Sequence, residues 1–172
     1  MSGATDEARS IYVTGLRNAH AMENQAVELL ERQVGRLENY PAMAERMRRH
    51  IEESKQQATR LEEALSGLGT SHSALKDTAM SLIGNLAALA HTPAPDEVIK
   101  NTLANFAFEH YEIAAYTSLL TLADAVAHAA AVPLLKQSLD EEVAMAAWIE
   151  SQIGPTTLTF LQRSEAGETA GR

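Results

Sequence analysis

Residues 105–120 read NFAFEHYEIAAYTSLL, and this stretch decides the fold class. Its apolar residues recur at the spacing of a helix that faces a protein interior. Glu109, His110, Tyr111 and Glu112 nevertheless stand in its middle. An unpaired carboxylate taken into the interior costs several kcal/mol. A buried helix with two carboxylates at its centre therefore needs partners that compensate their charge, and the rest of the chain offers candidates.

The composition around this stretch is that of an all-α protein with one domain. The chain has 172 residues, enough for a sizeable core, and few of them are Gly or Pro. The net charge of -9 argues against nucleic acid and anionic membrane as main partners. There is no cysteine, which leaves histidines and carboxylates as metal ligands. The polar N-terminus and the lack of an apolar run near ~20 residues predict a cytoplasmic protein outside membranes.

Turn signals divide the chain into four long helices and one shorter helix. The first long helix is expected to start between Asp6 and Ile11 and to reach residue 38. The other long helices are expected at 41–66, at 96–127 and from Pro133 to near Gly154. The shorter helix is expected at 73–90. Residues 155–172 are polar and are expected to form a disordered tail, so that the single domain covers 1–154.

The lengths of the connections predict how these helices pack. Short connections join the first helix to the second and the third to the fourth, and short connections make antiparallel neighbours. The connection between the second and third helices is long and carries the shorter helix, so it must cross the bundle. This is the topology of an antiparallel four-helix bundle with one crossover, as in ferritin-like folds.

Each long helix has an apolar stripe that faces the bundle axis, and each stripe is interrupted near its middle by an ionisable residue. The interrupting residues are Glu23, His50, Glu109 and Glu142. In an antiparallel hairpin, residues at equal distance from the turn lie at equal depth. Glu23 and Glu53 have their midpoint at residue 38, and Glu112 and Glu142 have theirs at residue 127, in both cases close to a short connection.

Four or more carboxylates are therefore expected at one level of the bundle. Left alone they would repel one another and take up protons, whereas a pair of divalent cations would compensate them. Oxygen ligands with one or two imidazoles suit iron or manganese better than zinc. Glu109 and Glu112 share a helix face, as do His50 and Glu53, because each pair is three residues apart.

Several roles stay open at this point. His50 either binds a metal or donates a hydrogen bond to a ligand, and His20 is a further possible ligand. Glu53 and Glu112 lie at the edges of their stripes and could be solvated or could support a ligand. His110 points about 100° away from Glu109 around the helix, which favours a place outside the cluster. A network of hydrogen bonds without metal is the alternative for the whole set.

Four motifs carry a resemblance to a known family. They are LRNAHAMENQA (16–26), HIEESKQQATRLEEAL (50–65), EHYEIAAY (109–116) and LKQSLDEEVA (135–144). The chain resembles the ferritin-like stress proteins of the YciF/YciE type over roughly residues 8–153. The resemblance implies a ferritin-like four-helix fold, a di-iron-type centre, a homodimer and a stress-related role. It implies as metal ligands Glu23, Glu53, Glu109, Glu112 and Glu142, with His50 on or beside the metals.

The chain departs from ferritins in one respect. Ferritins use Glu-x-x-His on two helices, whereas here His50 precedes Glu53 and no Glu-x-x-His occurs. Three functions are consistent with the pattern. The first is a stress-related protein that binds two iron ions, or manganese, and reacts with oxygen or peroxide or oxidises iron. The second is a non-enzymatic bundle with a structural or vestigial metal site, and the third is a hydroxylase of a small molecule.

Overall fold

The computed structural model describes residues 2–72 and 94–171. The helices are α1 (Ser2–Val34), α2 (Pro41–Gly67), α4 (Glu97–Ala125), a short 3-10 helix η2 (Ala129–Ala131) and α5 (Val132–Glu165). The four long helices predicted from the sequence are thus confirmed. The shorter helix predicted at 73–90 lies outside the described residues.

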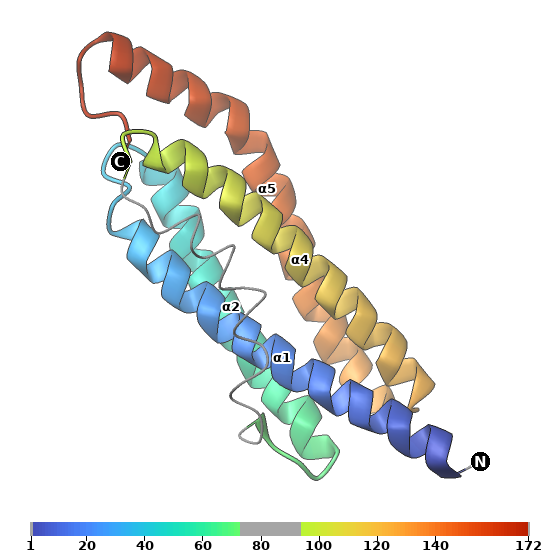
Figure 1. The fold of residues 1–172 in the computed structure, drawn as a ribbon. Helices are drawn as coiled ribbons and strands as arrows, with labels where there is room; N and C mark the ends of the chain where they lie inside the picture. Colours follow the sequence, from blue (N-terminus) through green and yellow to red (C-terminus); the bar gives the residue numbers. More distant parts are fainter. Residues whose placement is uncertain (1, 73–93, 172) are drawn as a thin grey trace.

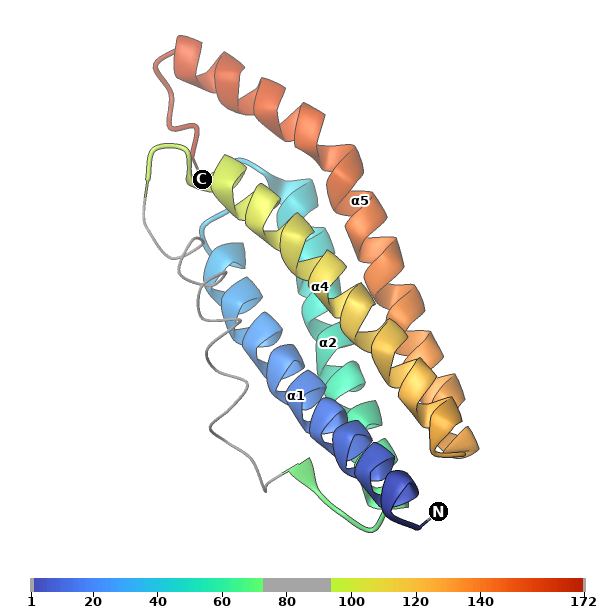
Figure 2. The ribbon, with the colours of Figure 1, turned by 45° about the vertical axis from the view of Figure 1, so that its right-hand side comes forward.

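The four long helices form an elongated bundle (Figures 1 and 2). α1 and α2 run antiparallel as one pair, and α4 and α5 run antiparallel as a second pair. α2 ends and α4 begins at opposite ends of the bundle, so the chain between them has to return along its length. The predicted topology with one long crossover is therefore confirmed.

Most predicted helix boundaries are accurate because proline and glycine mark them. Pro41 occupies the first turn of α2, as expected for a residue whose missing N–H is not needed there. Pro133 lies in the first turn of α5 for the same reason. α2 ends at Gly67, and Gly69 takes a φ of 69°, which glycine adopts without strain. α1 begins earlier than predicted, at Ser2.

The predicted end of the last helix near Gly154 and Pro155 is wrong. α5 contains Pro155 in its interior and continues to Glu165. The backbone carbonyl that loses its donor at Pro155 is that of Ser151, four residues earlier, and Ser151 is exposed, so this carbonyl can bond to water. The last turns of α5 lean away from α4 (Figures 1 and 2).

Residues 168–171 take a defined path back to the bundle in place of the disordered tail that was expected. The carbonyl of Ala170 accepts a hydrogen bond from the Tyr40 hydroxyl at 2.7 Å. The carbonyl of Gly171 accepts one from the backbone N–H of Val98 at 3.0 Å, in the first turn of α4. A Cβ on Gly171 would lie 2.3 Å from the carbonyl oxygen of Pro95, so this position has no room for a side chain.

The interior consists of two apolar clusters. One includes Tyr12, Leu16 and Leu135, near the N-terminus of α1. The other includes Leu30, Met47 and Ile149, toward the opposite end of the bundle. The buried carboxylates lie between the two clusters, so they are remote from both ends of the bundle. Among the described residues, no helix is long and apolar enough to cross a membrane.

Candidate metal centre

Five ionisable side chains from the four long helices lie buried at one level of the bundle. They are Glu23 (0% exposed), His50 (0%), Glu109 (2%), Glu112 (0%) and Glu142 (0%). Glu109 and Glu112 come from α4 and share its inner face because three residues nearly complete a helical turn. Carboxylates are rarely buried this completely without a compensating charge.

Four of the five side chains are close enough to share a metal ion. His50, Glu109, Glu112 and Glu142 each offer one ligand atom, and these atoms lie within 4.8 Å of one another. His50 Nε2 is 3.2 Å from Glu109 Oε2 and 3.6 Å from Glu142 Oε2. The predicted convergence of carboxylates on one level of the bundle agrees with this geometry.

Many of the polar atoms at this level are buried without a hydrogen-bond partner. The unpartnered ligand atoms are Glu23 Oε2, His50 Nε2, Glu109 Oε2, both carboxylate oxygens of Glu112 and both of Glu142. A buried polar group without a partner costs about 1–3 kcal/mol. A hydrogen-bond network without metal would have to satisfy these atoms, and most of them have no partner. A cation would satisfy them, because oxygen atoms and one imidazole nitrogen are its natural ligands.

The burial of the carboxyls shifts their pKa values strongly. Burial raises the pKa of Glu112 well above its usual range, and the charges of Glu142, Glu23 and Glu109 raise it further. Burial and the charge of Glu109 raise the pKa of Glu142 in the same way. Burial raises the pKa of Glu23 to about 8, although a hydrogen bond from Tyr116 opposes that rise. Metal binding at neutral pH would thus displace protons from this site.

His50 is oriented toward the cluster by Glu53. His50 Nδ1 lies 2.8 Å from Glu53 Oε2, so the Nδ1–H can donate to this carboxylate. In the neutral imidazole the other nitrogen, Nε2, then carries the lone pair and faces Glu109 and Glu142. Burial alone would lower the pKa of His50, but Glu109, Glu53 and Glu142 together raise it well above its usual value.

Glu53 itself is not brought into the buried cluster. Its side chain is 33% exposed and also accepts a hydrogen bond from Arg46 at 3.0 Å. The hydrogen bond with His50 and the contact with Arg46 lower the pKa of Glu53 to about 2, so it is ionised at neutral pH. Of the six predicted site residues, Glu53 is the one that lies on the outer side of His50.

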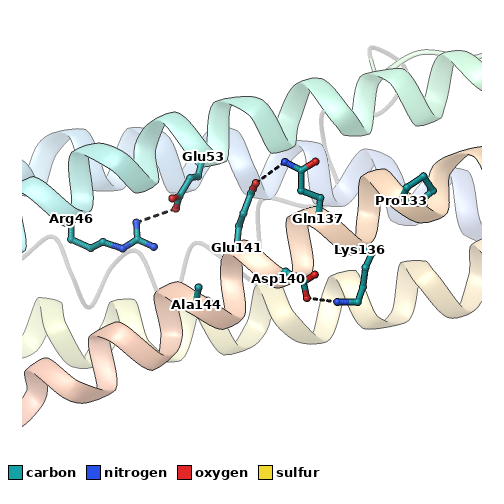
Figure 3. A pocket seen from close by; sticks show the side chains of 8 residues that line it. All are labelled: Arg46, Glu53, Pro133, Lys136, Gln137, Asp140, Glu141 and Ala144. Carbon is teal, nitrogen blue, oxygen red and sulfur yellow. Dashed lines mark hydrogen bonds and ion pairs between the residues drawn. The ribbon is translucent and has the colours of Figure 1, made fainter.

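A groove of about 520 Å³ reaches Glu53 from the surface between α2 and α5 (Figure 3). Charged residues contribute to its lining, among them Arg46, Lys136, Asp140 and Glu141. Figure 3 shows Arg46 paired with Glu53 in this groove and Lys136 paired with Asp140. Glu53 thus both lines this groove and contacts Nδ1 of His50 at 2.8 Å.

Three further polar residues lie buried beside the cluster. The Tyr116 hydroxyl donates to Glu23 Oε1 at 2.7 Å, which is the hydrogen-bonding core role that the sequence favours for this tyrosine. The sequence assigned no role to the other two. Ser54 and Gln57 are fully buried, and Ser54 Oγ and Gln57 Oε1 have no partner. Both occupy inward positions of α2 at helical spacing from His50, and polar residues at such positions are the signal that could have identified them.

Two charged residues hold α2 and α5 together beside the centre. Arg60 donates to both carboxylate oxygens of Glu141, at 2.7 and 2.8 Å, and to Ser138 at 3.0 Å. Gln57 Nε2 also donates to Glu141, at 3.0 Å. This two-point contact fixes the spacing of the two helices that carry His50 and Glu142.

The remaining histidines considered from the sequence lie outside the buried cluster. His110 is exposed on α4 and packs against Phe106, as its direction on the helix predicted. His20 faces outward, with Nε2 2.9 Å from Glu62. Neither of them approaches the five buried side chains closely enough to share a cation with them.

Comparison with known families identifies the chain at the level of a domain family. A family model described as Domain of unknown function (DUF892) matches residues 7–162. The chain belongs to this family. The DUF892 domain therefore includes all six residues predicted to form the metal site, and it extends beyond residue 154 into the second half of α5.

Three solved structures are similar to this DUF892 domain. A protein from Xanthomonas campestris pv. campestris has 29% identity and a TM-score of 0.77, covering 92% of this chain and 99% of that one. The E. coli stress protein YciF has 23% identity and a TM-score of 0.70, and the match covers 85% of this chain and 94% of that one. A bacterioferritin from Desulfovibrio desulfuricans with a diiron site has 18% identity and a TM-score of 0.73, and the match covers 98% of this chain and 91% of that one. The likeness to the bacterioferritin establishes the predicted ferritin-like fold.

Proposed function

We propose that this protein is a di-metal carboxylate protein that binds two iron or manganese ions between its four long helices. The observation that carries the proposal is the set of buried, unpartnered carboxylate oxygens that converge with the nitrogen of one histidine. The proposed ligands are Glu23, His50, Glu109, Glu112 and Glu142. Four carboxylates are enough to bridge a pair of divalent cations, as in sites with metals ~3.5–4 Å apart.

The ligand atoms favour iron or manganese among the common metals. Carboxylate oxygens prefer hard cations, and a single imidazole does not change that preference. In this arrangement Glu53 acts through His50, because it holds the ring with Nε2 facing inward. Arg46 in turn keeps Glu53 outside the cluster.

The protein's own side chains prepare the site for redox chemistry. The two apolar clusters on either side exclude water from the level of the carboxylates. Tyr116 orients Glu23 through its hydroxyl group. Iron or manganese bound there would supply a centre that can react with oxygen or peroxide. Since the E. coli protein of the same fold is described as a stress protein, a stress-related role is part of this proposal.

Metal analysis of the protein purified from iron-replete cells tests the proposal. We expect about two iron or manganese ions per chain, and we expect Glu109→Ala to abolish their binding. Glu150→Ala is the matched control, because Glu150 is exposed on α5 and its loss leaves the metal content unchanged. A metal-free protein whose stability does not respond to chelators would contradict the proposal. A steady consumption of peroxide or oxygen by the loaded protein would separate an enzyme from a structural bundle.

A further inference from the structure

A second group of metal-ligating side chains lies on the surface of the bundle. His20 on α1, Glu62 on α2 and His72, which follows α2, each offer one ligand atom, and these atoms lie within 4.8 Å of one another. The three side chains are 14%, 46% and 46% exposed, in contrast to the fully buried centre. Nothing in the proposed di-metal function uses them.

Two of the distances within this group match those between ligands of one small cation. Glu62 Oε1 lies 2.9 Å from His20 Nε2 and 3.5 Å from His72 Nδ1. Two ligand atoms on a tetrahedral zinc ion, each about 2.0–2.1 Å from it, are about 3.3 Å apart. The carboxylate oxygen is therefore already at ligand spacing from both imidazoles.

The neighbouring residues hold this group together from two sides. Arg17 donates to the hydroxyl of Thr70 at 2.7 Å and to the carbonyl of Ser71 at 2.9 Å, and so anchors the backbone next to His72. The Asn24 amide lies 3.3 Å from His20 Nδ1. The same amide nitrogen donates to the backbone carbonyl of His20 at 2.8 Å, so Asn24 holds His20 from the side of α1.

One movement is needed before both rings can bind the same ion. The two imidazoles are stacked, with centroids 4.5 Å apart and planes 20° from parallel. A metal lies in the plane of each imidazole that binds it, so two nearly parallel rings cannot share one ion as they stand. His72 is half-exposed and lies beyond the end of α2, which allows its ring to turn out of the stack.

We propose that His20, Glu62 and His72 form a second, surface metal site, selective for zinc or copper(II) over iron and manganese. Two imidazoles with one carboxylate suit these cations, whereas the oxygen-rich buried centre suits iron or manganese. The site leaves at least one coordination position open to water. Its metal connects α1 to the segment that follows α2.

Electron paramagnetic resonance with half an equivalent of copper(II) per chain counts the nitrogen ligands directly. We expect the signal of two imidazole nitrogens, since the buried centre can supply only one, from His50. His20→Gln and His72→Gln should each reduce the signal to one nitrogen. His110→Gln is the matched control, because His110 is exposed but belongs to neither group. A single-nitrogen signal in the parent protein would overturn the proposal.

Zinc titration calorimetry of the metal-depleted protein gives an independent measurement. We expect His72→Gln and Glu62→Gln to weaken the tightest zinc-binding phase at least about 10- to 100-fold, the range that loss of even an outer partner causes. Glu109→Ala should leave that phase unchanged, so failure of the buried centre does not affect this test. A zinc affinity that is lost with Glu109→Ala and retained with His72→Gln would assign the ion to the buried centre and refute the surface site.

Discussion

Glu112→Met is expected to make the metal-free protein more stable and to abolish tight metal binding at the buried centre. Both carboxylate oxygens of Glu112 are buried without a hydrogen-bond partner. Removing such a group recovers about 1–3 kcal/mol in the free energy of unfolding, and methionine fills a similar volume. The same change removes a metal ligand, and no neighbouring side chain can take its position.

Urea denaturation with and without manganese measures both effects. With chelator present, the variant should unfold at a higher urea concentration than the parent protein. Manganese at about 100 times its dissociation constant should stabilise the parent by about 2.7 kcal/mol and should leave the variant unchanged. A variant that is less stable than the metal-free parent would show that Glu112 takes part in a structural network.

Glu53→Met is the matched control with the opposite expected sign. Glu53 accepts hydrogen bonds from His50 and Arg46, so its removal leaves two cationic groups without their partner. We expect the metal-free Glu53→Met variant to be less stable than the parent protein. The two substitutions thus distinguish a carboxylate that has no partner in the metal-free protein from one that already has cationic partners.

The metal-free protein is expected to lose stability as the pH rises from 5.5 to 8. The pKa of Glu23 is raised from 4.5 to about 8 in the folded chain, chiefly by burial. Between these values the unfolded chain has released the proton and the folded chain retains it, so unfolding becomes easier at higher pH. The raised pKa values of Glu112, Glu142 and His50 act in the same direction. Glu53, with its pKa lowered to about 2, contributes nothing to the change in this range.

The size of this effect is up to about 1.4 kcal/mol per pH unit for each proton retained only by the folded chain. Urea denaturation in chelator at several pH values measures the slope, and Glu23→Gln should reduce it because an amide does not ionise. The stabilisation that manganese provides should grow as the pH rises, because the carboxyl ligands must lose their protons before they bind the metal. Equal stability of the chelated protein at pH 5.5 and 8 would mean that the buried carboxyls are ionised without metal.

The sequence was sufficient to predict the helices and the level of the site because both depend on regular spacing. Apolar residues at alternating intervals of three and four identified each inward face, and prolines placed the short turns. Glu23 and Glu53 then fell at similar depths by counting from the first turn, as did Glu112 and Glu142 by counting from the second. These features need no knowledge of how individual side chains pack.

The roles of Glu112 and Glu53 could not be predicted in the same way. Along α4, Glu112 and Ile113 both continue the spacing from Glu109 to Tyr116, and hydrophobicity favours Ile113 for the inward position. The structure buries Glu112 completely and leaves Ile113 partly exposed. Glu53 lies about 60° around α2 from His50, and its contact with Arg46 decides that it faces outward.

The end of α5 was mispredicted for a related reason. A Gly-Pro pair is a common helix terminator, but its effect depends on whether the freed carbonyl group can reach water. The freed carbonyl belongs to Ser151, which is exposed, and α5 continues for ten residues beyond Pro155 to Glu165. Whether this position is buried depends on tertiary packing, which the local sequence does not reveal.

The path of the last residues has a practical consequence for handling the protein. Gly171 is fixed between the carbonyl group of Pro95 and the N–H of Val98, so an extension added after it would have to leave from a crowded end of the bundle. A C-terminal polyhistidine tag would place foreign imidazoles next to this contact and add ligands to every copper and zinc measurement. A removable tag before Ser2, at the opposite end of the bundle, avoids this problem (Figure 1).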